Sequence, residues 1–259
     1  MASTLYQFAI SHYCEKARFA LDYKGADYRT VNLLPGLHVK TTKTLARRSS
    51  VPVLVTGDGT PVQGSDAIIS HLDDSVPENR LTPINPEQRQ RALEWERWLD
   101  RRVGVDVRRY CYHHLLPERR ISIRLLSYGG PWYGKFLLRM GYRNLELSMR
   151  RAMQIDESSA KQSLQNIEQA VTRLEERYAL SAFLVGDGFS RADLAAAALL
   201  APLVQPEGYG LVWPDTMPAA LEETRQRLEP RLQWIHRIYS HYRSKPITTP
   251  QVAPGARPK

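Results

Sequence analysis

The sequence predicts a small α/β domain followed by a larger all-helical domain. In the first part of the chain, short strand-like and helix-like segments alternate, whereas after residue 82 helical periodicity is almost unbroken. The proline-marked stretch LTPINPEQ separates the two patterns. A chain of 259 residues has room for two cores. We therefore predict domains at residues 1–81 and 87–245, and a disordered proline-rich tail at residues 246–259.

The first domain is expected to have the element order β-α-β-(α)-β-β-α, a mixed sheet with helices packed on it. TLYQFAI is strand-like, and CEKARFALDYKG carries apolar residues at helical spacing before a stop at Gly25. DYRTVNLL is again strand-like, and PGLHVKTTKTLARRSS is polar enough for only a short helix. VPVLVTGDGTPVQG predicts a hairpin, because Asp58-Gly59 suits its turn. SDAIISHLDDSVP then predicts a helix capped by Ser65.

Helical periodicity marks most of the second domain. The helical segments are EQRQRALEWERWLDRRVGV, residues 134–155, SAKQSLQNIEQAVTRLEERYAL, RADLAAAALLAPLV and AALEETRQRLEPRLQWIHRIYSHYRS. A weak strand signal returns only at residues 209–213.

Composition and charge exclude several classes of protein. No apolar stretch approaches the roughly 18 to 20 residues that cross a bilayer, and no secretory signal opens the chain, so we expect a cytoplasmic protein without a membrane span. Two cysteines, Cys14 and Cys111, make no disulfide framework. The formal charge of +9 is concentrated in residues 101–151. Without interleaved aromatic residues, this basic segment is interpreted as solvated helix faces and predicts no nucleic-acid partner.

Three motifs of the first domain together predict a binding groove. Ser11 follows a strand and begins a helix, where free backbone N–H groups and the helix dipole favour negative charge. At Val51-Pro52, a cis proline would leave the backbone of Val51 exposed for pairing with an extended peptide. Ser65, in the run Gly64-Ser65-Asp66, begins a second helix that suits a carboxylate. Each motif alone is equally explained by an ordinary cap or strand start.

The combination resembles the glutathione transferase family, in which a thioredoxin-like domain precedes an all-α domain. The resemblance covers about residues 3 to 245. The pattern Ser-x-x-x-x-Arg/Lys-x-Arg of the serine-using classes is matched by Ser11, Lys16 and Arg18. SVPVL and VQGSDAIISHLD are similar to the family's Val-Pro segment and second helix start. FLVGDGFSRADLAAAALL resembles the most characteristic stretch of the second domain, in which Ser190 and Asp193 form a capping box.

The resemblance implies a transferase acting in detoxification as a homodimer, with glutathione as co-substrate and no metal. Ser11 would be the catalytic residue, donating a hydrogen bond to the glutathione thiolate, which attacks a small hydrophobic electrophile. The implied glutathione-binding residues are Ser11, His38, Arg48, Val51, Pro52, Gly64, Ser65 and Asp66. The implied electrophile pocket contains Tyr13, Tyr110, Tyr112, His114 and Trp132. A metal site at His113-His114 is not expected, because adjacent helical residues point about 100° apart.

The sequence also departs from the family pattern, and the departures leave alternatives open. Gly64 stands where the family usually has Glu, Gln or Asp, so Asp66 is the candidate to replace that side chain. No basic residue directly precedes Val51, which leaves Arg48 or His38 to bind the glycyl carboxylate. These departures favour, as an alternative, a non-catalytic binder of ligands or proteins. A second alternative is a redox enzyme dependent on Cys14, since Ser-x-x-Cys resembles a glutaredoxin motif with its attacking cysteine replaced.

Overall fold

The computed structural model describes residues 2–243, and the predicted tail at 246–259 lies outside them. The first domain is built on a four-stranded sheet in the order β2-β1-β3-β4. Strand β1 pairs parallel with β2 and antiparallel with β3, which pairs antiparallel with β4. The strands are β1 (Ser3–Gln7), β2 (Tyr28–Asn32), β3 (Val53–Val55) and β4 (Pro61–Gln63). The mixed sheet predicted from the sequence, including the β3–β4 hairpin, is therefore confirmed.

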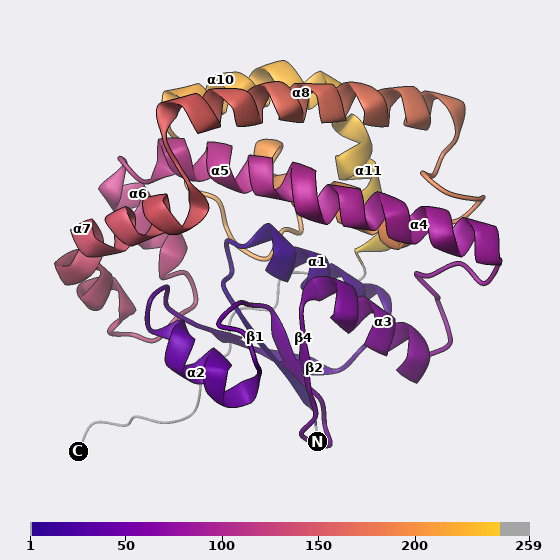
Figure 1. Cartoon of the computed structure of the whole chain (residues 1–259), viewed down its shortest axis with the longest axis horizontal. Helices are drawn as coiled ribbons and strands as arrows, with labels where there is room; N and C mark the ends of the chain where they lie inside the picture. Colours follow the sequence, from indigo (N-terminus) through magenta and orange to yellow (C-terminus); the bar gives the residue numbers. More distant parts are fainter. Residues whose placement is uncertain (1, 244–259) are drawn as a thin grey trace.

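Three helices complete this domain: α1 (His12–Tyr23), α2 (His38–Leu45) and α3 (Ser65–Ser75). Helices α1 and α3 pack together between the sheet and the helical domain, while α2 lies to one side of the sheet (Figure 1). One expectation is corrected. The cap of α3 is Gly64, not Ser65, and within residues 2–243 no side chain caps this helix.

Among residues 82–243, which form the second domain, all regular secondary structure is helical. Its α-helices are α4 (Pro86–Trp98), α5 (Gly104–Leu115), α6 (Arg119–Leu126), α7 (Gly134–Met153), α8 (Glu157–Leu180), α9 (Arg191–Leu200), α10 (Ala219–Leu228) and α11 (Gln233–Tyr242). A π-helix, η1 (Leu99–Val103), joins α4 to α5 in one long rod, and short 3₁₀ helices η2 (Ala201–Leu203) and η3 (Glu229–Arg231) follow α9 and α10 (Figure 1). The weak strand signal at 209–213 corresponds to no strand.

Helix α9 is the centre of the second domain, and every residue in it is buried. The predicted capping box at its start is confirmed: the Ser190 side chain accepts from the first turn, and the Asp193 carboxylate accepts from the Ser190 backbone N–H at 3.1 Å. Asp193 also accepts from the backbone N–H of Leu184 at 2.7 Å. The box therefore fixes the loop that leads into α9 as well as the helix itself.

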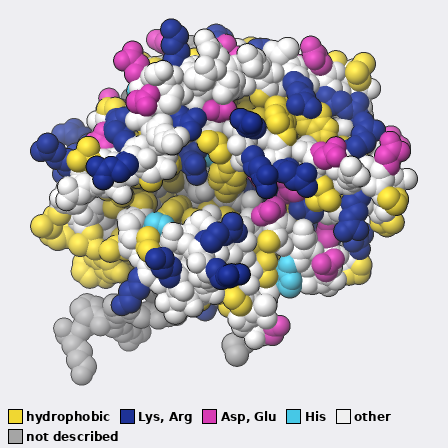
Figure 2. Space-filling view, viewed as in Figure 1, with side chains coloured by type: hydrophobic (Ala, Val, Ile, Leu, Met, Phe, Trp, Pro, Cys, Tyr) yellow, Lys and Arg dark blue, Asp and Glu magenta, His cyan; other side chains and the backbone are white. Residues whose placement is uncertain are grey.

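The outer surface carries dispersed charge and one apolar area. Lys and Arg side chains are spread over the visible face instead of forming a single patch, and apolar side chains gather over α7 (Figure 2). Among them, Trp132, Phe136 and Met140 are strongly exposed. No helix within residues 2–243 is long and apolar enough to cross a membrane.

Candidate active site

Ser11 occupies the N-cap of α1. Strand β1 ends at Gln7, earlier than the apolar run TLYQFAI suggests, so Phe8 to Ile10 form a turn that delivers Ser11 to the start of the helix. The Ser11 Oγ accepts a hydrogen bond from the Cys14 N–H at 3.4 Å. Because the hydroxyl is the acceptor in this bond, its own hydrogen can be donated either to the Cys14 thiol, which is within hydrogen-bond reach, or to a ligand.

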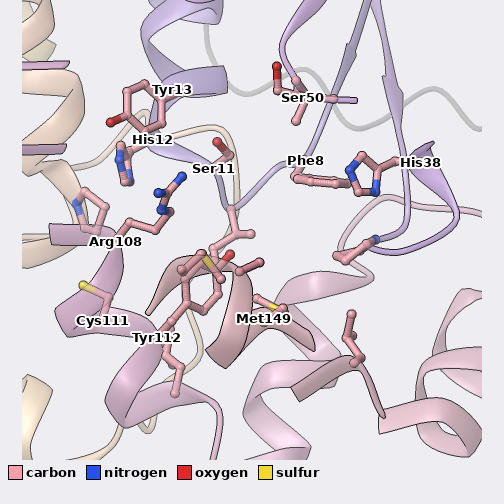
Figure 3. Close-up of a pocket in the computed structure, with 18 of the residues that line it drawn as sticks. Phe8, Ser11, His12, Tyr13, His38, Ser50, Arg108, Cys111, Tyr112 and Met149 are labelled. Carbon is pink, nitrogen blue, oxygen red and sulfur yellow. The ribbon is translucent and has the colours of Figure 1, made fainter. Parts of the chain in front are cut away.

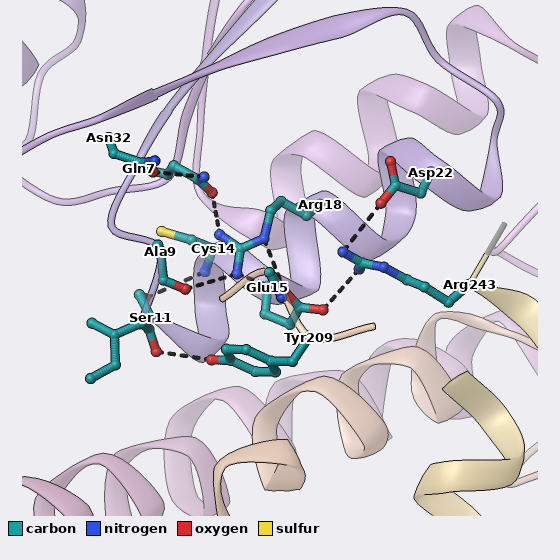
Figure 4. A network of polar contacts seen from close by, with 12 residues as sticks. Gln7, Ala9, Ser11, Cys14, Glu15, Arg18, Asp22, Asn32, Tyr209 and Arg243 are labelled. Atoms are coloured by element: carbon teal, nitrogen blue, oxygen red, sulfur yellow. Dashed lines mark hydrogen bonds and ion pairs between the residues drawn. The ribbon is translucent and has the colours of Figure 1, made fainter. Parts of the chain in front are cut away.

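The second domain fixes the backbone that carries Ser11. The Tyr209 hydroxyl, buried beyond α9, donates to the Ile10 carbonyl at 2.9 Å, directly before Ser11. The Arg18 guanidinium donates to the Ala9 carbonyl at 2.9 Å and pairs with Glu15 at 2.6 Å (Figure 4). Buried polar groups held by several partners specify one geometry. The turn before Ser11 is therefore held from both domains.

The other basic residue of the motif, Lys16, also serves the structure. Its ammonium is fully buried, 2.8 Å from Glu96 and 2.7 Å from Asp100 on the rod formed by α4 and η1. Glu96 in turn pairs with Arg191 of α9 at 2.6 Å. Burial alone would lower the pKa of Lys16, but the two carboxylates outweigh it and hold this pKa above its usual value. Lys16 thus joins the two domains, Arg18 holds the turn before Ser11, and neither lines the cavities described below.

Ser11 opens on a cavity of about 490 Å³ between the two domains. In Figure 3, Ser11 lies between side chains of α5 and the edge-to-face ring pair formed by Phe8 and His38. Much of the remaining wall is apolar: Leu115, Leu145, Met149, Trp213, Met217 and Leu221. Such a lining suits a hydrophobic reactant placed next to the hydroxyl.

A second cavity, of about 550 Å³, adjoins the first and is polar. Its walls include the predicted residues Arg48, Val51, Pro52, Gly64, Ser65 and Asp66. The Val51-Pro52 peptide bond is cis, as the sequence suggested. Within the described residues the backbone of Val51 makes no hydrogen bond, and Val51 lines both cavities. The two cavities and this free backbone form one groove across the start of α1 and α3.

The backbone at Gly64 explains the absence of an acidic side chain there. Its φ of +106° is one that only glycine adopts without strain. A Cβ at this position would also lie 2.8 Å from Asp66 Oδ1. The Asp66 carboxylate therefore occupies the space next to Gly64 and supplies a negative charge at the same place.

His38 and Arg48 lie in different parts of the groove. His38 borders the first cavity, where its Nδ1 accepts from the Gly36 N–H at 3.1 Å. Burial lowers the pKa of His38, so the ring is neutral near pH 7. Arg48 borders the polar cavity, with its Nη2 3.4 Å from the Gln63 carbonyl and close to Gly64.

The structure brings to the first cavity only some of the residues that the sequence suggested for an electrophile pocket. Tyr13 and Tyr112 line the first cavity. Tyr110, His114 and Trp132 do not border it. Tyr110 is buried against α10, where its hydroxyl bonds to Thr224, and the His114 ring packs on Tyr110. Trp132 is 81 % exposed. Packing of α5, α7, α10 and the loop before α10 supplies other residues that no sequence signal marked, namely Arg108, Cys111, Met149, Trp213 and Leu221.

Cys14 faces the interior instead of the groove. Its side chain is fully buried, and burial raises the pKa of the thiol. A reactive cysteine needs an exposed, acidic thiol, so this environment opposes the redox alternative. Within residues 2–243, no cluster of His, Cys, Asp and Glu could hold a metal ion.

Comparison with known proteins assigns both halves of the chain. Residues 5–80 match the model of the glutathione S-transferase N-terminal domain, and residues 136–218 match the model of the glutathione S-transferase C-terminal domain. The chain belongs to the glutathione S-transferase family. The thioredoxin-like first domain and the helical second domain are thus those of this family.

Individual relatives either have low sequence identity to this chain or match only a part of its length. "Glutathione S-transferase 1" of Dianthus caryophyllus is 38 % identical over 95 residues, which are 36 % of this chain and 42 % of that protein. Protein LigF of Sphingobium sp. strain SYK-6 is 24 % identical over 228 residues, 81 % of this chain and 82 % of LigF. A glutathione S-transferase from Methylobacillus flagellatus KT, solved with GSH bound, has a TM-score of 0.60 at 20 % identity, covering 94 % of this chain and 96 % of that one. At that identity the likeness concerns the fold.

Proposed function

We propose that this protein is a glutathione-dependent transferase in which Ser11 holds the glutathione sulfur as a thiolate. The observation that carries the proposal is the position of Ser11, whose hydroxyl can donate its hydrogen into the largely apolar cavity, and this cavity adjoins the polar one at Ser50 and Val51. Membership of the glutathione S-transferase family supports glutathione as the co-substrate.

Glutathione would lie along the groove with its backbone paired to Val51. The N-terminus of α3 at Ser65 suits the γ-glutamyl carboxylate, because no side chain among the described residues caps the first backbone N–H groups of this helix. Asp66, beside Gly64, would accept the ammonium group of the same end. His38 is better placed than Arg48 for the glycyl carboxylate, since Arg48 lies beside Gly64 at the γ-glutamyl end.

The chemistry needs only a hydrogen-bond donor. A free thiol has a pKa of about 8.5, so only a few per cent is ionised at pH 7. One hydrogen bond from Ser11 to the charged sulfur contributes roughly 1.5–3 kcal/mol, or about 1 to 2 pKa units. The thiolate then attacks an electrophilic carbon: a C–S bond forms, the leaving group departs with the bonding electrons, and the thiol proton passes to solvent.

The test compares Ser11→Ala with Cys14→Ala. In Ser11→Ala the thiol pKa of bound glutathione should rise by about 1 to 2 units, which the absorbance of the thiolate reports. The rate of chlorodinitrobenzene conjugation at pH 7 should fall about tenfold or more. Cys14→Ala should leave the thiol pKa unchanged. An unaltered thiol pKa in Ser11→Ala would contradict the proposal.

A non-catalytic binder is the second candidate, and the missing side chain at Gly64 favours it. Such a protein would retain glutathione in calorimetry without lowering its thiol pKa, and it would conjugate no acceptor. The same titration therefore separates the two candidates.

A further inference from the structure

Arg108 is a cation with no role in the proposed activation of glutathione. It lies on α5, in the second domain, and lines both cavities of the groove. In Figure 3 its guanidinium points toward Ser11 and His12, on the side of the cavity formed by α5. Cys111 and Tyr112 follow it along the same wall.

Arg108 has no partner within the part of the chain that the structure describes. Its Nε is buried and makes no hydrogen bond, and the guanidinium forms no ion pair. The nearby acids are already engaged: Asp100 binds Lys16, and Asp106 accepts from Ser163 at 2.8 Å and from Asn166 at 3.1 Å. Arg108 is half-buried, so its charge is only partly solvated and lacks a protein partner, and a ligand that carries a negative charge would be favoured beside it.

The side chains next to Arg108 cannot supply that charge. Burial and, secondarily, Arg108 lower the pKa of His12 to about 3, which makes His12 neutral. Burial raises the pKa of Tyr13 and of Tyr112 well above the usual range, so both phenols stay protonated at pH 7. Among the described residues that line the first cavity, Arg108 is thus the one charged side chain, and its neighbours there are neutral.

We propose that Arg108 is the recognition site for a carboxylate on the second substrate. The transferase would then select hydrophobic electrophiles that carry an anionic group, with the apolar wall at Met149, Trp213 and Leu221 holding the rest of the molecule. The planar guanidinium can bind a carboxylate through two parallel hydrogen bonds. This inference rests on the proposed function for the identity of the second substrate. In the binding mode proposed above, Ser65 and His38 take the two carboxylates of glutathione, which leaves Arg108 for the second substrate.

The test measures binding without chemistry. Equilibrium dialysis of the full chain, with glutathione present, compares meta-nitrobenzoate with its neutral isostere meta-nitrobenzamide; neither has a leaving group. The wild type should bind the benzoate at least about tenfold more tightly. Arg108→Met should bring the ratio close to one, and Arg108→Lys should keep part of it. Arg124→Met, an equal charge change at an exposed position of α6 outside both cavities, should keep the full ratio.

Three results would overturn the inference. These are equal binding of both probes by the wild type, a preference that persists in Arg108→Met, or displacement of glutathione by the benzoate, which would place Arg108 in the glutathione site. If Arg108→Met does not fold, the wild-type ratio and Arg108→Lys decide. Dialysis needs no turnover, so the two tests are independent. If the Ser11 test fails but the preference for the benzoate remains, only the proposed thiolate chemistry is contradicted. If the Ser11 test succeeds but the preference is absent, only the carboxylate site at Arg108 is contradicted.

Discussion

At the scale of single residues, the position of Ser11 depends on a hydroxyl far along the chain. Tyr209→Phe removes the bond to the Ile10 carbonyl and should cost about 1–2 kcal/mol of unfolding free energy, because a buried acceptor loses its partner. The turn before Ser11 also loosens, so the pKa of bound glutathione should rise toward that of the free thiol. Tyr110→Phe, which loses a comparable buried bond to Thr224, is the matched control for the absorbance titration. Equal thiol pKa values in the two variants would refute this positioning role.

At the scale of elements, the start of α3 requires glycine. Gly64→Ala introduces a side chain at φ +106° and against the Asp66 carboxylate, so we expect a loss of about 1–3 kcal/mol in urea unfolding and weaker glutathione binding in calorimetry. Gly141→Ala is the control: this glycine lies within α7 with no atom near its missing Cβ, and alanine there should stabilise the protein by about 0.5–1 kcal/mol. Unchanged stability and affinity in Gly64→Ala would show that the turn adapts.

At the scale of the whole molecule, Glu15 connects the domains and makes stability depend on pH. Burial raises its pKa, but Arg243 at 2.8 Å and Arg18 outweigh burial and hold the pKa below its usual range. The folded pKa lies below the unfolded value of about 4.3, so this stability is present above that pH and is lost as pH falls through the folded pKa. Glu15→Gln should lower the unfolding free energy at pH 7 by ~3–5 kcal/mol and weaken its acid dependence in urea titrations. Glu146→Gln, which breaks a more exposed pair with Arg150, should cost less than about 1 kcal/mol.

Signals between neighbouring residues were sufficient to predict much of the fold and one side of the groove. The caps at Ser11 and Ser190 and the hairpin before Gly64 act through local backbone geometry, which a short sequence window contains. The opposite wall could not be predicted, because Arg108, Met149 and Trp213 meet Ser11 only through the packing of separate helices. For the same reason, Tyr110 and His114 look equivalent to Tyr112 in the sequence, although Tyr110 bonds to α10 and His114 packs on Tyr110.

The buried ammonium of Lys16 has a consequence for recombination between related genes. Its acidic partners, Glu96 and Asp100, belong to the other half of the polypeptide, and Arg191 completes the same cluster. A chimera joined near residue 82 with a parent that lacks those acids would inherit an interior cation with nothing to neutralise it. Each half can therefore diverge only while the other preserves its matching charge, so the two must evolve as a pair.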